Sequence, residues 1–142
     1  MDIKTFGLEA ADHEVDVLRA LIAHEQFRDG YIGGGPGAGN AEHGPYRLEC
    51  VGVDSYERID PELAVGVVEE WAGQFGTVSP DLAGELEREV LARFRNAGEV
   101  FVLRELEDDA VVEYGQVHCE FHEFVTVDRT LGEVALIVAA DD

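Results

Sequence analysis

The sequence predicts an α+β fold, a single domain over residues 1–142 in which an antiparallel sheet packs against about three helices. Apolar residues recur at helical spacing in three segments of the first two thirds of the chain. The period changes to two in the last third, where short turns separate the apolar segments and therefore require antiparallel neighbours. A length of 142 residues with 46% hydrophobic side chains fits one domain with its own core.

The N-terminal segment predicts a short strand followed by a helix. Residues 2–6 (DIKTF) are the candidate strand. A helix is predicted over 12–28, because Asp12 is a suitable N-cap and Gly30 is a suitable stop. Its apolar stripe consists of Ala11, Val15, Leu18 and Ile22, widened by Val17 and Leu21.

Residues 30–45 predict a glycine-rich flexible surface loop, because seven glycines and two prolines cannot continue a helix or a central strand. The run GGGPGAG invites comparison with a phosphate-binding loop. Such a loop needs a Lys-Ser/Thr pair that opens a helix, or a strand before it and a helix after it. Here a predicted helix precedes the glycines and a predicted strand over 46–53 (YRLECVGV) follows them. This order is the reverse of what phosphate binding requires.

Two more helices are predicted, from Asp60 to Gly76 and from Ser79 to Gly98. Each begins with an N-cap residue followed by a proline, whose missing N–H is not needed at the first helical position. An acidic residue comes next and favours the positive end of the helix. The predicted buried stripes are Leu63, Val67, Trp71 and Phe75 in the first of these helices and Leu82, Leu86, Val90 and Phe94 in the second.

The last third predicts a three-stranded antiparallel meander over 99–107, 110–127 and 134–140. One or two strands from the N-terminal part of the chain would complete a sheet of four or five strands. The three helices come before most of this sheet in the sequence, and we expect them to pack on it.

The net charge is −21, from 31 acidic and ten basic side chains. This balance argues against direct nucleic-acid binding, which depends on basic side chains that neutralise phosphates. No stretch approaches the roughly 18 apolar residues of a membrane span, and the start of the chain lacks the pattern of a secretory signal, so a cytoplasmic location is expected. The acidity itself has three explanations, which are adaptation to a salt-rich cytoplasm, docking on a basic partner and metal collection.

A candidate metal site lies in the segment VHCEFHEF. Strand alternation places His118, Glu120 and His122 on one face of the predicted strand, where they could offer nitrogen and oxygen ligands to a divalent transition metal. A further ligand would have to come from another element, such as His24 or His43. The alternative is that these residues form the polar face of a half-covered sheet. No other cofactor is expected.

A candidate partner surface combines aromatic and acidic residues. Alternation places Tyr114 and Phe124 on the same strand face as the histidines. An acidic turn would add carboxylates for a basic partner. These acidic residues are Glu105, Glu107, Asp108 and Asp109.

No catalytic motif occurs in the sequence, and no catalytic residue is assigned. The cysteines, Cys50 and Cys119, have no metal-binding spacing and are expected to be reduced. The preferred hypothesis is a small non-enzymatic binding protein, of the inhibitor or immunity type, that docks a basic protein. A metal-binding protein or metal-dependent enzyme is the alternative, and self-association through the aromatic face is a third possibility.

Overall fold

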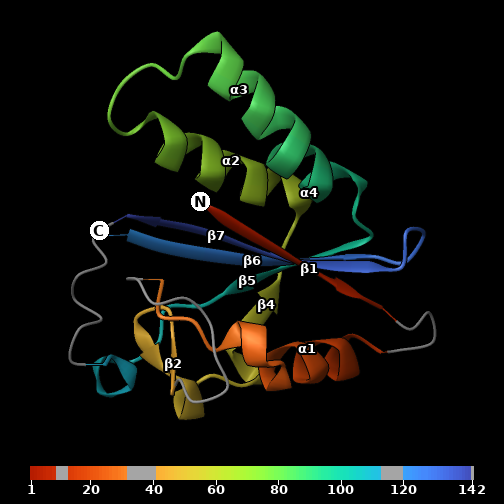
Figure 1. Cartoon of the computed structure of the whole chain (residues 1–142), viewed down its shortest axis with the longest axis vertical. Helices are drawn as coiled ribbons and strands as arrows, with labels where there is room; N and C mark the ends of the chain where they lie inside the picture. The colour runs from red at the N-terminus through yellow and green to blue at the C-terminus, as the bar shows by residue number, and fades with distance from the viewer. Residues whose placement is uncertain (9–12, 32–40, 113–119, 142) are drawn as a thin grey trace. The chain divides into compact units, whose positions relative to one another are not determined.

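The computed structural model describes residues 1–8, 13–31, 41–112 and 120–141. Its helices and its antiparallel sheet confirm the predicted α+β class (Figure 1). The chain forms two compact units. Unit 1 consists of Met1–Leu8, Arg58–Val102 and Glu123–Ala139, and unit 2 consists of Glu9–Glu57, Leu103–His122 and Ala140–Asp142.

The main sheet has five strands in the order β1-β7-β6-β5-β4. Strand β1 (Asp2–Gly7) pairs antiparallel with β7 (Glu133–Asp141), and β5 (Glu99–Leu103) pairs antiparallel with β6 (Glu120–Asp128). The adjacent positions of β5, β6 and β7 confirm the predicted meander. The pairing of β1 confirms the predicted N-terminal strand.

The prediction of a strand over 46–53 is wrong. Only β3 (Tyr46–Arg47) is extended there, and it pairs with β2 (Glu42–His43) in a separate two-stranded ribbon. Two 3₁₀ turns follow, η2 (Leu48–Cys50) and η3 (Val53–Ser55), and β4 (Tyr56–Arg58) then joins the main sheet. The turns are stabilised by local hydrogen bonds, such as that from the Gly52 N–H to Ser55 Oγ at 3.0 Å.

The predicted strand over 110–127 is only partly correct. Asp108–Ala110 form a 3₁₀ turn, η5, and Val111 makes an isolated bridge to Tyr46. Residues 113–119 lie outside the described residues, and the strand β6 begins at Glu120.

The predicted alternation of β6 between an apolar and a polar face is also wrong at residues 123–127. Phe124 and Thr126 on one face are buried, and so are the side chains between and beside them, Glu123, Val125 and Val127. A strand buried on both faces loses the two-residue pattern, because neither face meets water.

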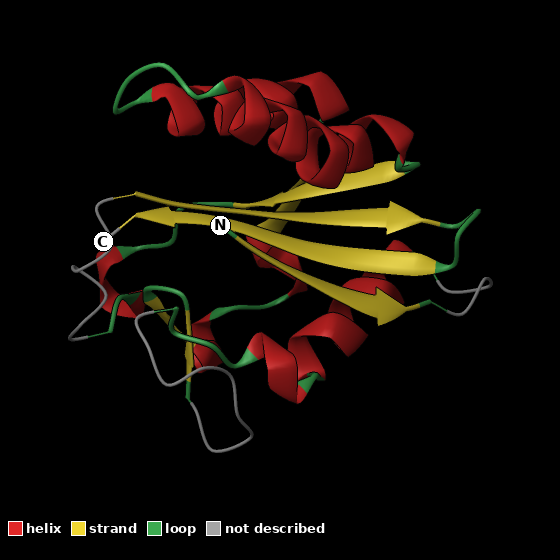
Figure 2. Cartoon of the chain, turned by 45° about the horizontal axis from the view of Figure 1, so that its top comes forward, coloured by secondary structure: helices red, strands yellow, loops and turns green. Residues whose placement is uncertain are grey.

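The helices of unit 1 are α2 (Pro61–Gly73), α3 (Pro80–Leu86) and α4 (Ala92–Asn96), and the π turn η4 (Glu87–Leu91) joins the last two. The predicted caps are confirmed. The Asp60 side chain accepts from the Glu62 N–H at 2.9 Å, and Ser79 Oγ accepts from the Leu82 N–H at 3.4 Å. Figure 2 shows these helices along one face of the unit 1 strands.

The core of unit 1 forms between α2, the η4–α4 segment and the sheet. Phe94 of α4 and Phe124 of β6 meet edge to face, with ring centroids 5.2 Å apart. The buried residues of this cluster are Ala64, Val65, Val68, Val90, Leu91, Phe94, Val100, Phe124, Ala135 and Ile137.

The predicted buried stripe of α2 is therefore wrong in part. Leu63 and Phe75 are exposed, while Ala64, Val65 and Val68 are buried. The helix sequence PELAVGVVEEWAG carries apolar residues on more than one face, so the helical period alone did not determine which face meets the sheet. In the third predicted helix, Val90 and Phe94 are buried as expected, but Leu82 is exposed.

The main helix of unit 2 is α1 (Glu14–Ala23), which buries Val17, Leu18 and Leu21. It ends before the predicted residue 28, because His24 is extended and begins a 3₁₀ turn, η1 (Glu25–Phe27). The predicted N-cap is wrong, because the N-cap residue of α1 is His13; Asp12 itself lies outside the described residues. Among the helices that the structure describes, none combines the length and apolarity needed to span a bilayer.

Candidate functional site

The predicted metal ligands are only partly described. His122 Nε2 lies 3.0 Å from Glu120 Oε2, so the two side chains interact at the start of β6. His118 lies outside the described residues. Within residues 1–8, 13–31, 41–112 and 120–141, no group of three or more His, Cys, Asp or Glu side chains is arranged to hold a metal ion.

His24 and His43, the predicted sources of a further metal ligand, each make a hydrogen bond that supports the local structure. His24 caps η1, and its Nδ1 accepts a hydrogen bond from the Gln26 N–H at 3.1 Å. His43 is fully buried, and its Nδ1 lies 2.5 Å from the carbonyl oxygen of Phe27. A carbonyl only accepts, so Nδ1 carries the proton in this contact.

The predicted partner-binding residues are only partly described, and one of them is buried. Phe124 is completely buried in the core of unit 1, so it cannot contact a partner, and its assignment as a contact residue is corrected. Tyr114 lies outside the described residues. The four acidic residues at 105–109 are exposed in unit 2. Their carboxylates remain available to a partner.

The structure instead reveals an apolar groove in unit 1, which we call the α2–α3 groove. Its volume is about 900 Å³. One wall comes from the end of α2 and the connection that follows it, and the other from α3 and the π turn. Its main lining side chains are Ile3, Trp71, Phe75, Val78, Leu82 and Leu86.

Large apolar side chains are unusually exposed along this groove. Phe75 is 85% exposed and Leu82 is 59% exposed, and Met1 at the groove is 45% exposed. Among the described residues, six large hydrophobic side chains are exposed. Three of the six, Met1, Phe75 and Leu82, line the groove. A cluster of exposed apolar side chains marks a binding surface more often than single exposed residues do.

Helix α3 contributes the most exposed wall of this groove. None of its seven residues is buried, although Leu82 and Leu86 repeat at helical spacing. Figure 1 shows α3 diverging from α2 toward the connection between them. Most of the stability of a short helix comes from packing of its apolar side. In α3, Leu86 packs partly against the core, whereas Leu82 is left exposed at the groove.

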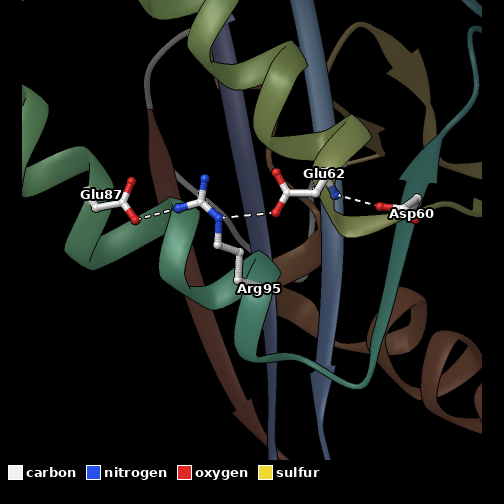
Figure 3. Close-up of polar contacts among 4 residues, drawn as sticks. All are labelled: Asp60, Glu62, Glu87 and Arg95. Carbon is white, nitrogen blue, oxygen red and sulfur yellow. Dashed lines mark hydrogen bonds and ion pairs between the residues drawn. The ribbon is translucent and has the colours of Figure 1, made fainter.

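At the end away from the α2–α3 connection, charged contacts link α2 to the π turn and α4 (Figure 3). Arg95 Nε donates to Glu62 Oε1 at 3.2 Å, and Arg95 Nη1 donates to Glu87 Oε1 at 2.5 Å. The hydrogen bond to Glu62 raises the pKa of the Arg95 guanidinium above its ordinary value; burial opposes this shift, and the charge of Glu87 adds to it. Arg95 therefore stays charged and links the start of α2 to the π turn.

The charged side chains that line the groove are both acidic. Glu85 and Glu89 are the charged side chains that line it, and neither is ion-paired among the described residues. Glu70 and Asp81 are exposed on the same helices. Of the arginines nearby, Arg88 in the π turn does not line the groove, Arg93 pairs with Glu133 at 2.6 Å, and Arg95 pairs with Glu62 and Glu87. The groove is thus an apolar channel with carboxylates along its rim.

No family model, no curated protein and no solved structure matches this chain.

Sequence patterns identified the apolar residues of this groove but assigned them to the core. Phe75 and Leu82 were placed in buried stripes because they lie at helical spacing from Trp71 and Leu86. The spacing reports that an apolar face exists and does not report what covers it. The sequence did carry one signal for the groove, because the apolar residues of α2 lie on more than one face of the helix and one packed layer cannot bury them all.

Proposed function

We propose that this chain is a protein-binding module that docks a basic protein partner in the α2–α3 groove of unit 1. The observation that carries the proposal is that α3 buries none of its residues while its apolar side lines the groove. A partner that covers Phe75 and Leu82 would bury the apolar surface that these residues now expose to water.

The charge of the chain favours a basic partner. The net charge is −21, and the rim carboxylates of Glu85 and Glu89 carry the same sign as the whole chain. An excess of one charge attracts oppositely charged partners from a distance and speeds their association. Apolar contacts at the centre and complementary charges at the rim are the usual arrangement of a protein interface.

Affinity capture from cells with groove variants tests the proposal. Leu63 and Leu82 are a matched pair, because each is the third residue of a helix that begins with a capped proline, and their exposures are 63% and 59%. Only Leu82 lines the groove. We expect a basic protein that is captured by the wild type and by Leu63→Glu at low salt, and lost with Leu82→Glu.

Salt provides the second criterion. Raising the salt to about 1 M shortens the screening length to about 3 Å, so charge steering is removed while apolar contacts remain. We expect capture to weaken strongly. If Leu63→Glu and Leu82→Glu retain the same proteins, or if capture is insensitive to salt, the groove is not the docking site of a basic partner.

The metal-binding alternative remains a prediction, since His118 lies outside the described residues. The contact between His122 and Glu120 is compatible with a ligand pair, and equally with an ordinary ion pair at the start of a strand.

A further inference from the structure

We infer that the partner element bound in the α2–α3 groove is an amphipathic α-helix of about three turns, with an apolar face and flanking Lys or Arg residues. This inference rests on the proposed docking function and specifies the conformation of the bound segment. Its apolar face would contact Trp71, Phe75 and Leu82, and its basic residues would meet Glu85 and Glu89.

The length of the groove matches such a helix. The wall formed by α3 and the π turn contributes lining residues from Ser79 to Val90. At a rise of about 1.5 Å per residue, these residues span roughly 16 Å. A bound helix of about 11 residues has the same length and presents anchors at positions i, i+3 or i+4, and i+7.

The walls favour a helix over an added strand. Strand addition requires a row of unpaired backbone N–H and C=O groups. Helices α2 and α3 satisfy their own backbone groups, apart from their ends, and offer side chains to the groove. Of the edge strand β1, only Ile3 lines the groove, with Met1 just before it. Side-chain packing between helices is thus the available mode of binding.

The shape of the groove also fits a third helix. The Arg95 contacts to Glu62 and Glu87 hold one end of the helix pair together, and α2 packs on α4. Toward the connection, α3 diverges from α2 (Figure 1). The π turn Glu87–Leu91 follows α3 directly and contributes Glu89 and Val90 to the wall of the groove. Such turns are frequently found at functional sites, where they alter the course of a helix.

The probes are synthetic peptides of about 12 residues made of Leu and Lys. The first peptide has Leu at helical spacing and forms one apolar face when helical. The second has the same composition with Leu and Lys alternating, which favours a strand. The third replaces the Lys residues of the first with Glu. Trp71 is the single tryptophan of the chain and lines the groove, so its fluorescence reports binding directly.

Leu82→Ala and the double variant Glu85→Gln/Glu89→Gln test the groove. Leu63→Ala and Glu49→Gln/Glu57→Gln are the matched controls, with the same changes at exposed positions outside the groove. We expect the helical Lys peptide to bind the wild type, to gain helicity on binding as measured by circular dichroism, and to bind Leu82→Ala about tenfold more weakly. The Glu85→Gln/Glu89→Gln variant should also weaken binding and reduce its salt dependence, whereas the controls should not.

Each outcome has a defined meaning. If the alternating peptide binds more tightly than the helical one and Leu82→Ala weakens it, the helix inference is wrong while the groove remains the docking site. If binding of both peptides is unaffected by the groove variants, then only non-specific charge attraction is present, and the proposed function is wrong as well. If the Glu peptide binds as tightly as the Lys peptide, the basic character of the partner is refuted. Dimerisation of the protein that is lost with Leu82→Ala would identify a second copy as the occupant and overturn the inference.

Discussion

Phe27 and His43 stack face to face in unit 2, with ring centroids 3.6 Å apart and an interplanar angle of 2°. Both side chains are completely buried. Phe121 and Tyr31 approach the His43 ring edge-on and complete an aromatic cluster around it. The histidine is thus part of the core of unit 2, at the end of the segment that the sequence predicted to be a flexible loop.

Replacing His43 by alanine is expected to destabilise the protein by about 3 kcal/mol, because it removes a buried ring and a buried hydrogen bond. His43→Phe keeps a ring of similar size and should cost only about 1 kcal/mol, since the Phe27 carbonyl still accepts from the Asp29 N–H at 3.0 Å. Urea denaturation measures both values. His13→Ala is the control, because His13 is exposed and makes no capping hydrogen bond. Equal values for His43→Ala and His13→Ala would contradict the buried position.

Phe124→Ala should destabilise the protein strongly, whereas Phe75→Ala should have almost no effect on stability. Phe124 is buried against Phe94, so its truncation should cost about 3–5 kcal/mol of unfolding free energy. Phe75 is 85% exposed, and its truncation should change stability by less than about 0.5 kcal/mol. Thermal and urea unfolding of the two variants check this. A large loss with Phe75→Ala would show that this ring supports the fold, and the groove would lose its status as an unoccupied surface.

Removing the cap of α2 should lower the stability of the whole protein, whereas removing the cap of α3 should act mainly on α3 itself. Asp60→Ala removes the cap of α2, which contributes to the core, and is expected to lower the global unfolding free energy by about 1 kcal/mol. Ser79→Ala removes the cap of α3, which buries no residue, so it should increase local opening of α3 with a smaller global effect. Hydrogen exchange measures the local part. Equal global losses in the two variants would mean that α3 is as firmly integrated as α2.

Arg95→Gln should lower the melting temperature at low salt, and the difference from the wild type should shrink at about 1 M salt, where exposed charges are screened. The raised pKa of Arg95 means that the folded state favours the charged form. Its stabilising contribution is therefore fully present below the ordinary arginine pKa and is lost only as the pH rises through the still higher folded pKa. The arginine itself causes no pH dependence between pH 5 and 9. Arg19→Gln, which disrupts an exposed pair with Asp16, is the control.

Removing metal ions should leave the melting temperature unchanged, because the proposed groove uses no metal. The check compares the purified protein before and after treatment with EDTA, together with elemental analysis. A loss of stability that zinc restores in the wild type, and fails to restore in a His118→Ala/His122→Ala variant, would instead support the predicted site at His118, Glu120 and His122.

Local chemistry explains which features could be predicted. The caps at Asp60 and Ser79 depend only on neighbouring residues, and they were confirmed together with the helices that they begin. The strand over 46–53 failed because its apolar letters did not reveal the turns at Gly52–Ser55, which side-chain hydrogen bonds stabilise. The buried His43 carried no sequence signal, since its ring is enclosed by Phe27 and Phe121 from distant parts of the chain.

The candidate site shows the same division. The sequence established that Trp71, Phe75, Leu82 and Leu86 lie on apolar helix faces, and that the chain is strongly acidic. It could not establish that Phe124 is covered while Phe75 is not, because burial depends on which element packs opposite each face.

By itself, the sequence determined the α+β class, the starts of α2 and α3, the antiparallel meander and the charge of −21, because these depend on local periodicity, capping and composition. Only the tertiary structure decided which apolar residues enter a core and which remain at the surface. Helices α2 and α3 both have apolar faces. Helix α2 packs against α4, whereas α3 diverges from α2. This difference in packing leaves Leu82 and Phe75 exposed beside Glu85 and Glu89.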